Sequence, residues 1–145
     1  MRLINALIAK SIAETILVAT LGLVFYLSAF PPYFHGWGEV SQGGISGWAV
    51  DHSAPWKRVD AQLFIDGKFV AAIAANQSRP DVVNSGWARD EWHGYRFNAP
   101  LLPAGLHEAR VYALHSSAGG LRQSLQLLGD PIKFVVEENG ELRKF

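Results

Sequence analysis

The sequence predicts a mainly β protein in which a single N-terminal transmembrane helix precedes an antiparallel β-sandwich. Two observations lead to this prediction. The segment Thr15–Phe34 is twenty residues long and has no charged side chain. The rest of the chain alternates short stretches of apolar and polar residues with turns rich in glycine, proline and asparagine, which is the pattern of a sandwich of short strands.

The composition limits the classes of protein that remain. Hydrophobic residues make up 49% of the 145 residues and charged residues 18%, which excludes a disordered chain. Thirteen basic residues balance thirteen acidic ones, so no overall positive field would attract nucleic acid. The absence of cysteine excludes disulfides, thiolate metal sites and cysteine nucleophiles.

The uncharged segment has the length of a membrane crossing. Twenty residues at 1.5 Å each span roughly 30 Å, the thickness of the hydrocarbon core of a bilayer. Pro31 and Pro32 end the helix because proline has no amide hydrogen to donate. The aromatic residues that follow are expected to form a belt at the membrane interface: Tyr33, Phe34 and Trp37.

Two alternatives compete with a permanent anchor. A buried helix of a soluble protein would normally keep a polar stripe. A cleaved signal peptide would need small residues at its cleavage site, and Leu27-Ser28-Ala29 matches that pattern poorly. We therefore favour a signal anchor that spans residues 15–34.

The charges before the span predict its orientation. Because Arg2 and Lys10 precede the apolar segment, the N-terminus is expected in the cytoplasm. The predicted domains are a cytoplasmic lead-in with the helix (1–35) and an extracytoplasmic sandwich (36–145). In a two-membrane bacterium this is a single-pass protein of the inner membrane with a periplasmic domain. Four small residues on one side of the helix are candidates for contact with another helix: Ser11, Thr15, Ala19 and Gly22.

The sandwich strands follow from alternation and turn residues. Strands are expected at Ile45–Asp51, Val59–Ile65 and Lys68–Ala75, with Asp66-Gly67 as a type I′ turn between the last two. A long connection over 76–92 holds a possible short helix at Asp81–Ala88. Further strands are expected at 93–98, 107–115 and 132–136. Residues 124–128 are left undecided, and Asn139-Gly140 begins either a last hairpin into 142–145 or a frayed tail.

Five short motifs in this order are similar to a known module. They are Gly47-Trp48-Ala49-Val50-Asp51, Ile65-Asp66-Gly67, Arg79-Pro80-Asp81-Val82, His93-Gly94-Tyr95 and Val111-Tyr112-Ala113-Leu114. Together they resemble a bacterial Ig-like β-sandwich module found in envelope and polysaccharide-associated proteins. The resemblance covers roughly residues 45–115. It implies the fold and a non-catalytic domain, without a defined ligand.

Several side chains have expected structural roles. Trp48 is expected in the core, and Tyr95 and Phe97 are expected to face inward. Arg79 and Asp81 are expected to hold their loop by hydrogen bonds to the backbone. The five histidines, at positions 35, 52, 93, 107 and 115, are expected to be solvated or to cap local structure. The sequence has no HExxH, GxSxG, GxGxxG or P-loop motif, so we expect neither an enzyme nor a bound cofactor or metal.

Two classes of function remain. The first is a non-catalytic accessory subunit that docks to a larger membrane complex, such as a photosynthetic, respiratory or secretion assembly. The second is a membrane-tethered carbohydrate-binding module. Trp87, Arg89 and Trp92 in the long connection are candidates for contact with a protein partner or with a sugar, and Trp37 is a further aromatic candidate. Packing of these tryptophans onto the sandwich is the alternative.

Overall fold

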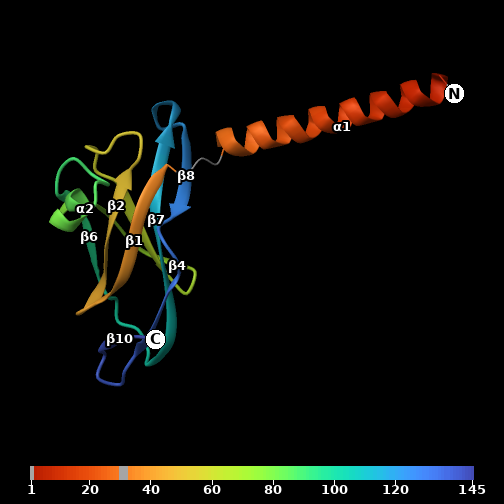
Figure 1. Ribbon diagram of the computed structural model, residues 1–145. Helices are drawn as coiled ribbons and strands as arrows, with labels where there is room; N and C mark the ends of the chain where they lie inside the picture. Colours follow the sequence, from red (N-terminus) through yellow and green to blue (C-terminus); the bar gives the residue numbers. More distant parts are fainter. Residues whose placement is uncertain (1, 30–32) are drawn as a thin grey trace. The chain divides into compact units, whose positions relative to one another are not determined.

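The computed structural model describes residues 2–29 and 33–145 and confirms the mainly β fold class, with one apolar N-terminal helix followed by two antiparallel sheets. The chain divides into two compact units, of which the second is Tyr33–Phe145. In chain order the elements are α1 (Arg2–Ala29), β1 (Phe34–Ser41), β2 (Gly44–Asp51), β3 (Asp60–Ile65), β4 (Lys68–Ala74), β5 (Gln77–Ser78), α2 (Pro80–Asn84), β6 (Trp92–Asn98), β7 (Gly105–Ser117), η1 (Ala118–Gly120), β8 (Arg122–Leu127), β9 (Ile132–Val136) and β10 (Leu142–Lys144) (Figure 1).

Helix α1 is long and apolar enough to cross a membrane. Its 28 residues extend for about 42 Å at 1.5 Å per residue. The candidate span is Ile4–Tyr26, with a mean hydropathy of 1.8, and its large apolar side chains are exposed to the surroundings. The predicted span of residues 15–34 therefore needs correction at both ends. The helix begins well before Thr15, and Phe34 already belongs to strand β1.

The sandwich unit consists of a four-stranded and a six-stranded sheet. The first has the order β1-β2-β6-β5. The second has the order β10-β9-β7-β3-β4, and β8 also pairs with β7. β7 is the longest strand because it pairs with β9 over its first residues and with β8 over its last, on the same edge. The sheets enclose a core that includes Tyr95 and Phe97 from β6 and Leu63 from β3.

Most of the strands predicted from alternation are present. The Asp66-Gly67 turn has φ angles of 49° and 75°, as a type I′ turn requires, and it joins β3 to β4. The undecided segment at 124–128 lies largely in β8, and Asn139-Gly140 lies in the hairpin that joins β9 to β10. Strands β1 and β5 were not predicted.

Strand β1 belongs to the second unit, and this changes the interpretation of the expected aromatic belt. Phe34 is only 6% exposed and packs in the sandwich core, so its predicted place at the membrane interface is wrong. Tyr33 is half-buried and its ring stacks on His115 at a centroid distance of 3.8 Å. Trp37 lies in the middle of β1 and is 43% exposed.

Candidate functional site

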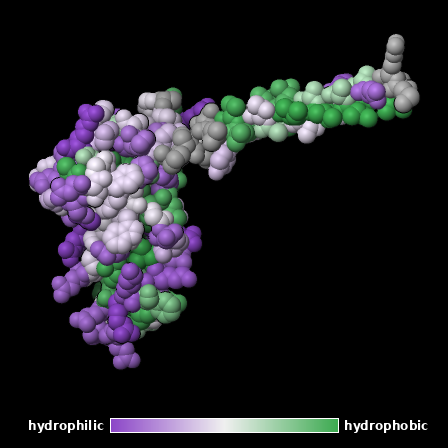
Figure 2. Space-filling view, viewed as in Figure 1, coloured by the Kyte–Doolittle hydropathy of each residue, from purple (hydrophilic) through white to green (hydrophobic). Residues whose placement is uncertain are grey.

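The outer side of the four-stranded sheet carries an aromatic cluster. We call it the aromatic face and define it by His35 and Trp37 of β1, Trp48 of β2 and Trp87 of the segment after α2. The ring of Trp87 lies 4.6 Å from that of His35 and 6.2 Å from that of Trp48, between ring centroids. The ring of His52, just after β2, lies 5.3 Å from that of His35. Figure 2 shows pale residues in the middle of the sandwich in this view, with strongly hydrophilic residues along its left side and hydrophobic ones in its lower part.

The pairing of β1 with β2 places these side chains together. Trp37 is directly opposite Trp48 in the antiparallel ladder, so both side chains point to the same side of the sheet. The residues that flank them and face the other side are small, and all except Ala49 are glycines. A Cβ at Gly38 would lie 2.6 Å from the hydroxyl of Tyr95, and one at Gly36 would lie 2.6 Å from the carbonyl oxygen of Trp48.

Tyr95 occupies the space beneath β1 and β2. Its side chain is 1% exposed, and its hydroxyl donates a hydrogen bond of 3.1 Å to the carbonyl oxygen of Trp37. Burial raises the pKa of this hydroxyl above its usual value, so the group stays protonated and donates. The hydrogen bond and the ring fix the strand that carries Trp37.

The segment after α2 brings Trp87 over the sheet. Val82 is buried beneath this segment, and its carbonyl oxygen accepts a hydrogen bond of 3.1 Å from the amide of Trp87. Gly86 has a φ of 78°, a conformation that suits glycine and ends the short helix. Trp87 is 46% exposed, so one side of its ring is free to contact a partner.

Arg79 and Asp81 stabilise this segment by binding each other. Two hydrogen bonds of 2.8 and 2.7 Å join the guanidinium to the carboxylate. These bonds lower the pKa of Asp81 below its ordinary value. The prediction that both side chains bind the backbone is therefore wrong for Arg79, which binds the carboxylate of Asp81, whereas backbone amides of Asp81 and Val82 also contribute to the lowered pKa of the Asp81 carboxylate. The backbone amide of Arg79 also donates to the carbonyl of Glu91.

The three residues predicted as one contact site lie in different surroundings. Trp87 belongs to the aromatic face, whereas the guanidinium carbon of Arg89 lies 5.7 Å from the ring centroid of Trp56. Trp92 begins β6 and is 47% exposed, and its amide donates to the Asp90 carboxylate.

Trp48 is only half-buried, so the prediction that it packs in the core is wrong. Alternation along β2 turns Gly47 and Ala49 inward instead.

The histidines differ in environment. His93 is fully buried, and its Nε2 lies 3.6 Å from the carboxylate of Asp90. Within residues 2–29 and 33–145, its Nδ1 has no hydrogen-bond partner. His107 is 9% exposed and contacts Asp66 and the carbonyl of Pro103 at 2.6 and 2.9 Å. The expectation of solvated histidines is therefore wrong for His93, while His107 holds a turn.

Both partners of His107 are acceptors, and this sets its protonation state. A carboxylate and a carbonyl are both satisfied only when both ring nitrogens carry hydrogen. Asp66, followed by Pro103, raises the pKa of His107 above its usual value. The backbone amide of Glu108, followed by His107, lowers the pKa of Asp66. This pair joins the β3–β4 turn to the beginning of β7. In the described part of the chain, no three His, Asp or Glu side chains are grouped so that they could hold a metal ion.

The predicted helix-contact residues lie along α1. Ser11, Thr15 and Ala19 line a shallow hollow together with Glu14 and Val18. The hydroxyl of Thr15 donates to the carbonyl of Ser11, so it is satisfied within the helix. A Cβ at Gly22 would have no atom within 4 Å apart from the backbone of its own helix. Lys10 and Glu14 form an ion pair of 3.6 Å one turn apart.

Comparison with known proteins adds no relative, because no family model, curated protein or solved structure matches this chain. The resemblance to an Ig-like module stays a prediction at the level of family. The two-sheet architecture that it implied is present in the structure.

Proposed function

We propose that this protein is a non-catalytic accessory subunit of a larger membrane complex. Helix α1 crosses the inner membrane once, with the N-terminus in the cytoplasm and the sandwich on the periplasmic side. The length and hydropathy of α1 support the crossing, and Arg2 and Lys10 near its start support the orientation. The acidic groups of two ion pairs, Arg79–Asp81 and His107–Asp66, are already engaged in holding turns, which supports a structural role.

The aromatic face is the observation that carries this proposal. Trp37 and Trp87 are both more than two-fifths exposed, although burial of a large aromatic side chain stabilises a protein. Tryptophan is enriched at the centres of protein interfaces, where its ring fills a pocket of the partner. The Tyr95 hydrogen bond holds the backbone of Trp37, and the ring of Trp87 is held by contact with His35 and Trp48, which lowers the entropy lost on association.

A second function, carbohydrate binding, is favoured by the ring geometry. The planes of Trp48 and Trp87 are inclined by 33°, and those of His35 and Trp87 by 36°. The ring of Trp87 therefore packs against those of His35 and Trp48, and its exposed side is a surface on which the apolar side of a sugar can stack. The sandwich would then be a membrane-tethered glycan-binding module, and the same residues would carry the contact.

One pair of variants tests the proposal. The tagged full-length chain is purified from its native membranes in mild detergent, and the complex is sized by native electrophoresis and mass spectrometry. We expect stoichiometric membrane-protein partners with the unchanged chain, and their loss when Trp37→Ala and Trp87→Ala are combined. The matched control is Leu106→Ala, which removes an exposed apolar side chain from β7 in the other sheet.

The same preparations distinguish the two functions. Recovery of the unchanged chain alone, together with glycan binding that Trp37→Ala and Trp87→Ala abolish, would replace the subunit by the glycan-binding module. Partners that remain bound to the double variant would show that the aromatic face is not the docking surface.

A further inference from the structure

The end of the sandwich at which the chain enters is firmly built. The carbonyl oxygen of Tyr33 accepts a hydrogen bond of 2.8 Å from the amide of His52. The side-chain oxygen of Gln126 accepts from the amides of Tyr33 and Phe34 at 2.8 and 3.1 Å. The ring of Tyr33 also stacks on His115. The first residue of the sandwich is therefore held by the β2–β3 loop and by strands β7 and β8.

Chain length keeps this end close to the end of α1. Three residues separate Ala29 from Tyr33. Even a fully extended chain of this length spans only about 14 Å between those two Cα positions. If α1 crosses the bilayer, as proposed above, the end of the sandwich that carries Tyr33 lies next to the membrane surface.

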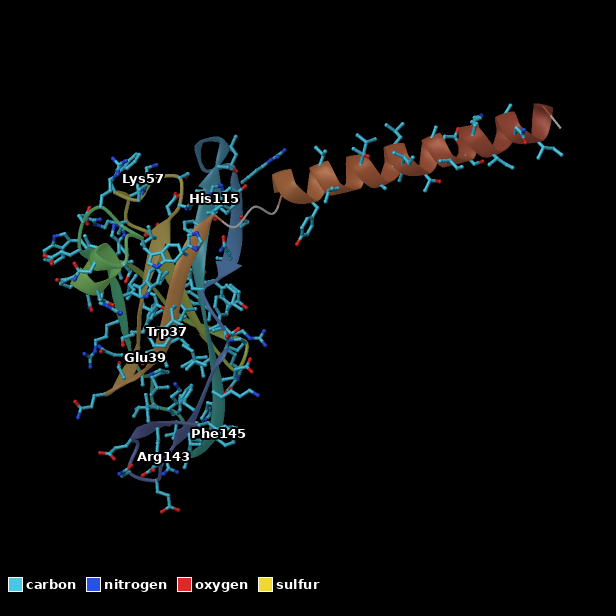
Figure 3. All side chains as sticks on the ribbon, viewed as in Figure 1. Trp37, Glu39, Lys57, His115, Arg143 and Phe145 are labelled. Atoms are coloured by element: carbon cyan, nitrogen blue, oxygen red, sulfur yellow. The ribbon has the colours of Figure 1, made fainter. Side chains whose placement is uncertain are left out.

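The loops at this end carry exposed apolar tips. Trp56 in the β2–β3 loop is 56% exposed, and Leu121 between η1 and β8 is 88% exposed. The β2–β3 loop adjoins the end of β7 that leads into η1, because Lys57 and Ser116 line the same open hollow of about 520 Å³. Figure 3 shows Lys57 and His115 at one end of the sandwich and Arg143 and Phe145 at the other. An exposed tryptophan at a loop tip next to a membrane is typical of the lipid–water interface.

Three unpaired cations accompany the apolar tips. Within the described residues, Lys57, Arg89 and Arg122 are exposed and take part in no ion pair. Arg89 lies over the ring of Trp56, so a cation and an aromatic ring are presented together. Basic side chains of this kind are attracted to an anionic lipid surface.

The opposite end of the sandwich carries both signs of charge. The hairpin between β9 and β10 holds three acidic residues, and its two strands hold three basic ones, of which Arg143 pairs with Glu137 at 3.4 Å. The short tether and the apolar tips, together with the cations beside them, point to the bilayer surface as the occupant of the end that carries Tyr33.

We infer that the end of the sandwich formed by the β2–β3 loop and the η1–β8 tip rests on the bilayer surface, with Trp56 and Leu121 in the interface and Lys57, Arg89 and Arg122 against anionic lipid headgroups. This inference rests on the proposed membrane crossing of α1. The short tether makes the contact intramolecular in effect, so even weak affinity for lipid suffices to keep the end in place. The sandwich is thereby held in a defined orientation that presents the aromatic face sideways.

The chain lacks cysteine, so single cysteines can carry a spin label without further changes. The full-length chain is reconstituted into vesicles of phosphatidylcholine with phosphatidylglycerol. Label depth is measured by accessibility to oxygen and to a water-soluble nickel complex. Gln123→Cys reports on the proposed contact, Glu138→Cys on the opposite end, and Val18→Cys on the helix. We expect Val18 deep in the bilayer, Gln123 at the headgroups and Glu138 in water.

Substitutions in the Gln123→Cys background test whether the proposed residues make the contact with the bilayer. Trp56→Ser with Leu121→Ser should move the label into water, whereas Leu101→Ser at another exposed apolar position should not. Replacing Lys57, Arg89 and Arg122 by glutamine should remove the difference between anionic and pure phosphatidylcholine vesicles. The matched control replaces Lys133, Arg143 and Lys144, at the opposite end, by glutamine and should leave that difference in place.

The three labels separate the two hypotheses. A deep Val18 label with Gln123 as accessible to water as Glu138 would overturn the surface contact and leave the membrane crossing intact. A Val18 label exposed to water would overturn the crossing, and the inference that rests on it. A Gln123 label at the headgroups that ignores the Trp56 and Leu121 substitutions would show that these residues do not make the contact.

Discussion

The two sheets fill the same core in different ways. In the six-stranded sheet, β3 and β7 turn aliphatic side chains such as Leu63 and Val111 inward, and both are at most 1% exposed. In the four-stranded sheet, β1 and β2 also turn glycines inward beside core residues such as Phe34 and Ile45, and the ring of Tyr95 occupies the space beneath Gly38 and Gly47. The middle of a strand can therefore be held by a ring beneath it while its own side chains serve the outer surface.

The variant expected to lose the most stability tests the aliphatic part of the core, beneath the six-stranded sheet. Because Leu63 is fully buried, Leu63→Ala is expected to lower the free energy of unfolding by about 3 kcal/mol through lost burial and a residual cavity. Urea unfolding of the full-length chain in detergent, followed by tryptophan fluorescence, measures it. The exposed Leu106→Ala is the control. Equal losses for both variants would contradict this description of the core.

The next variant tests the part of the core where Tyr95 lies beneath the glycines of β1 and β2. A methyl group at Gly38 would meet the Tyr95 hydroxyl at 2.6 Å and Ile132 at 3.2 Å. Overpacking of this kind costs about 2 kcal/mol, and the same unfolding experiment measures it. Gly22→Ala in α1, where no atom apart from the backbone of its own helix lies within 4 Å, should leave sandwich unfolding unchanged.

Removing the clashing hydroxyl sharpens this test. Tyr95→Phe alone should cost about 1 kcal/mol, because the carbonyl of Trp37 loses its hydrogen bond. In the Gly38→Ala, Tyr95→Phe double variant the loss of stability should be smaller than the sum of the two single losses, because the added methyl group no longer meets a hydroxyl. Strict additivity would show that the two residues are not in contact.

The smallest effect concerns the ion pair between His107 and Asp66, which joins the beginning of β7 to the β3–β4 turn. The folded-state pKa of His107 is raised above 6.5, so its contribution is fully present below pH 6.5 and is lost as the pH rises through the raised value. The pKa of Asp66 is lowered from 3.8, so its contribution is present above pH 3.8 and is lost as the pH falls through the lowered value. The ion pair between His107 and Asp66 therefore stabilises the fold most between pH 3.8 and pH 6.5.

Solvent screening limits the size of this effect. The Asp66 side chain is 47% exposed, so the loss above pH 6.5 should stay below about 1 kcal/mol. Urea unfolding at a series of pH values should show the loss in the unchanged chain and its disappearance in Asp66→Asn. His52→Gln, at an exposed histidine, should keep it. A pH dependence that persists in Asp66→Asn would assign the effect to another group.

Sequence analysis succeeded where a local pattern carries the structure. The β3–β4 hairpin follows from alternation on both sides of Asp66-Gly67, and both residues adopt the positive φ angles that this dipeptide favours. Strand β1 was missed because its inward positions at 36 and 38 are glycine, which removes the apolar alternation. Strand β8 gave a weak signal because Arg122–Leu127 is mostly exposed and pairs only with β7.

The aromatic face required the tertiary structure. Trp37 and Trp48 meet through the register of β1 and β2, and Trp87 joins them only after α2 has folded over Val82. Trp87 and Trp92 are close in the sequence, and that proximity suggested one contact site. The structure instead places Trp87 beside residues about forty to fifty positions earlier, which no local spacing indicates.

The central claim is that α1 crosses the membrane once and holds the sandwich outside the cytoplasm. Because the chain has no cysteine, Glu138→Cys and a cysteine added before Met1 are labelled separately in intact spheroplasts with a maleimide that does not cross membranes. We predict that Glu138→Cys reacts at once, that the added cysteine reacts only after lysis, and that both proteins stay with carbonate-washed membranes. Reaction of the added cysteine before lysis, protection of Glu138→Cys, or release of the protein from washed membranes would contradict the account.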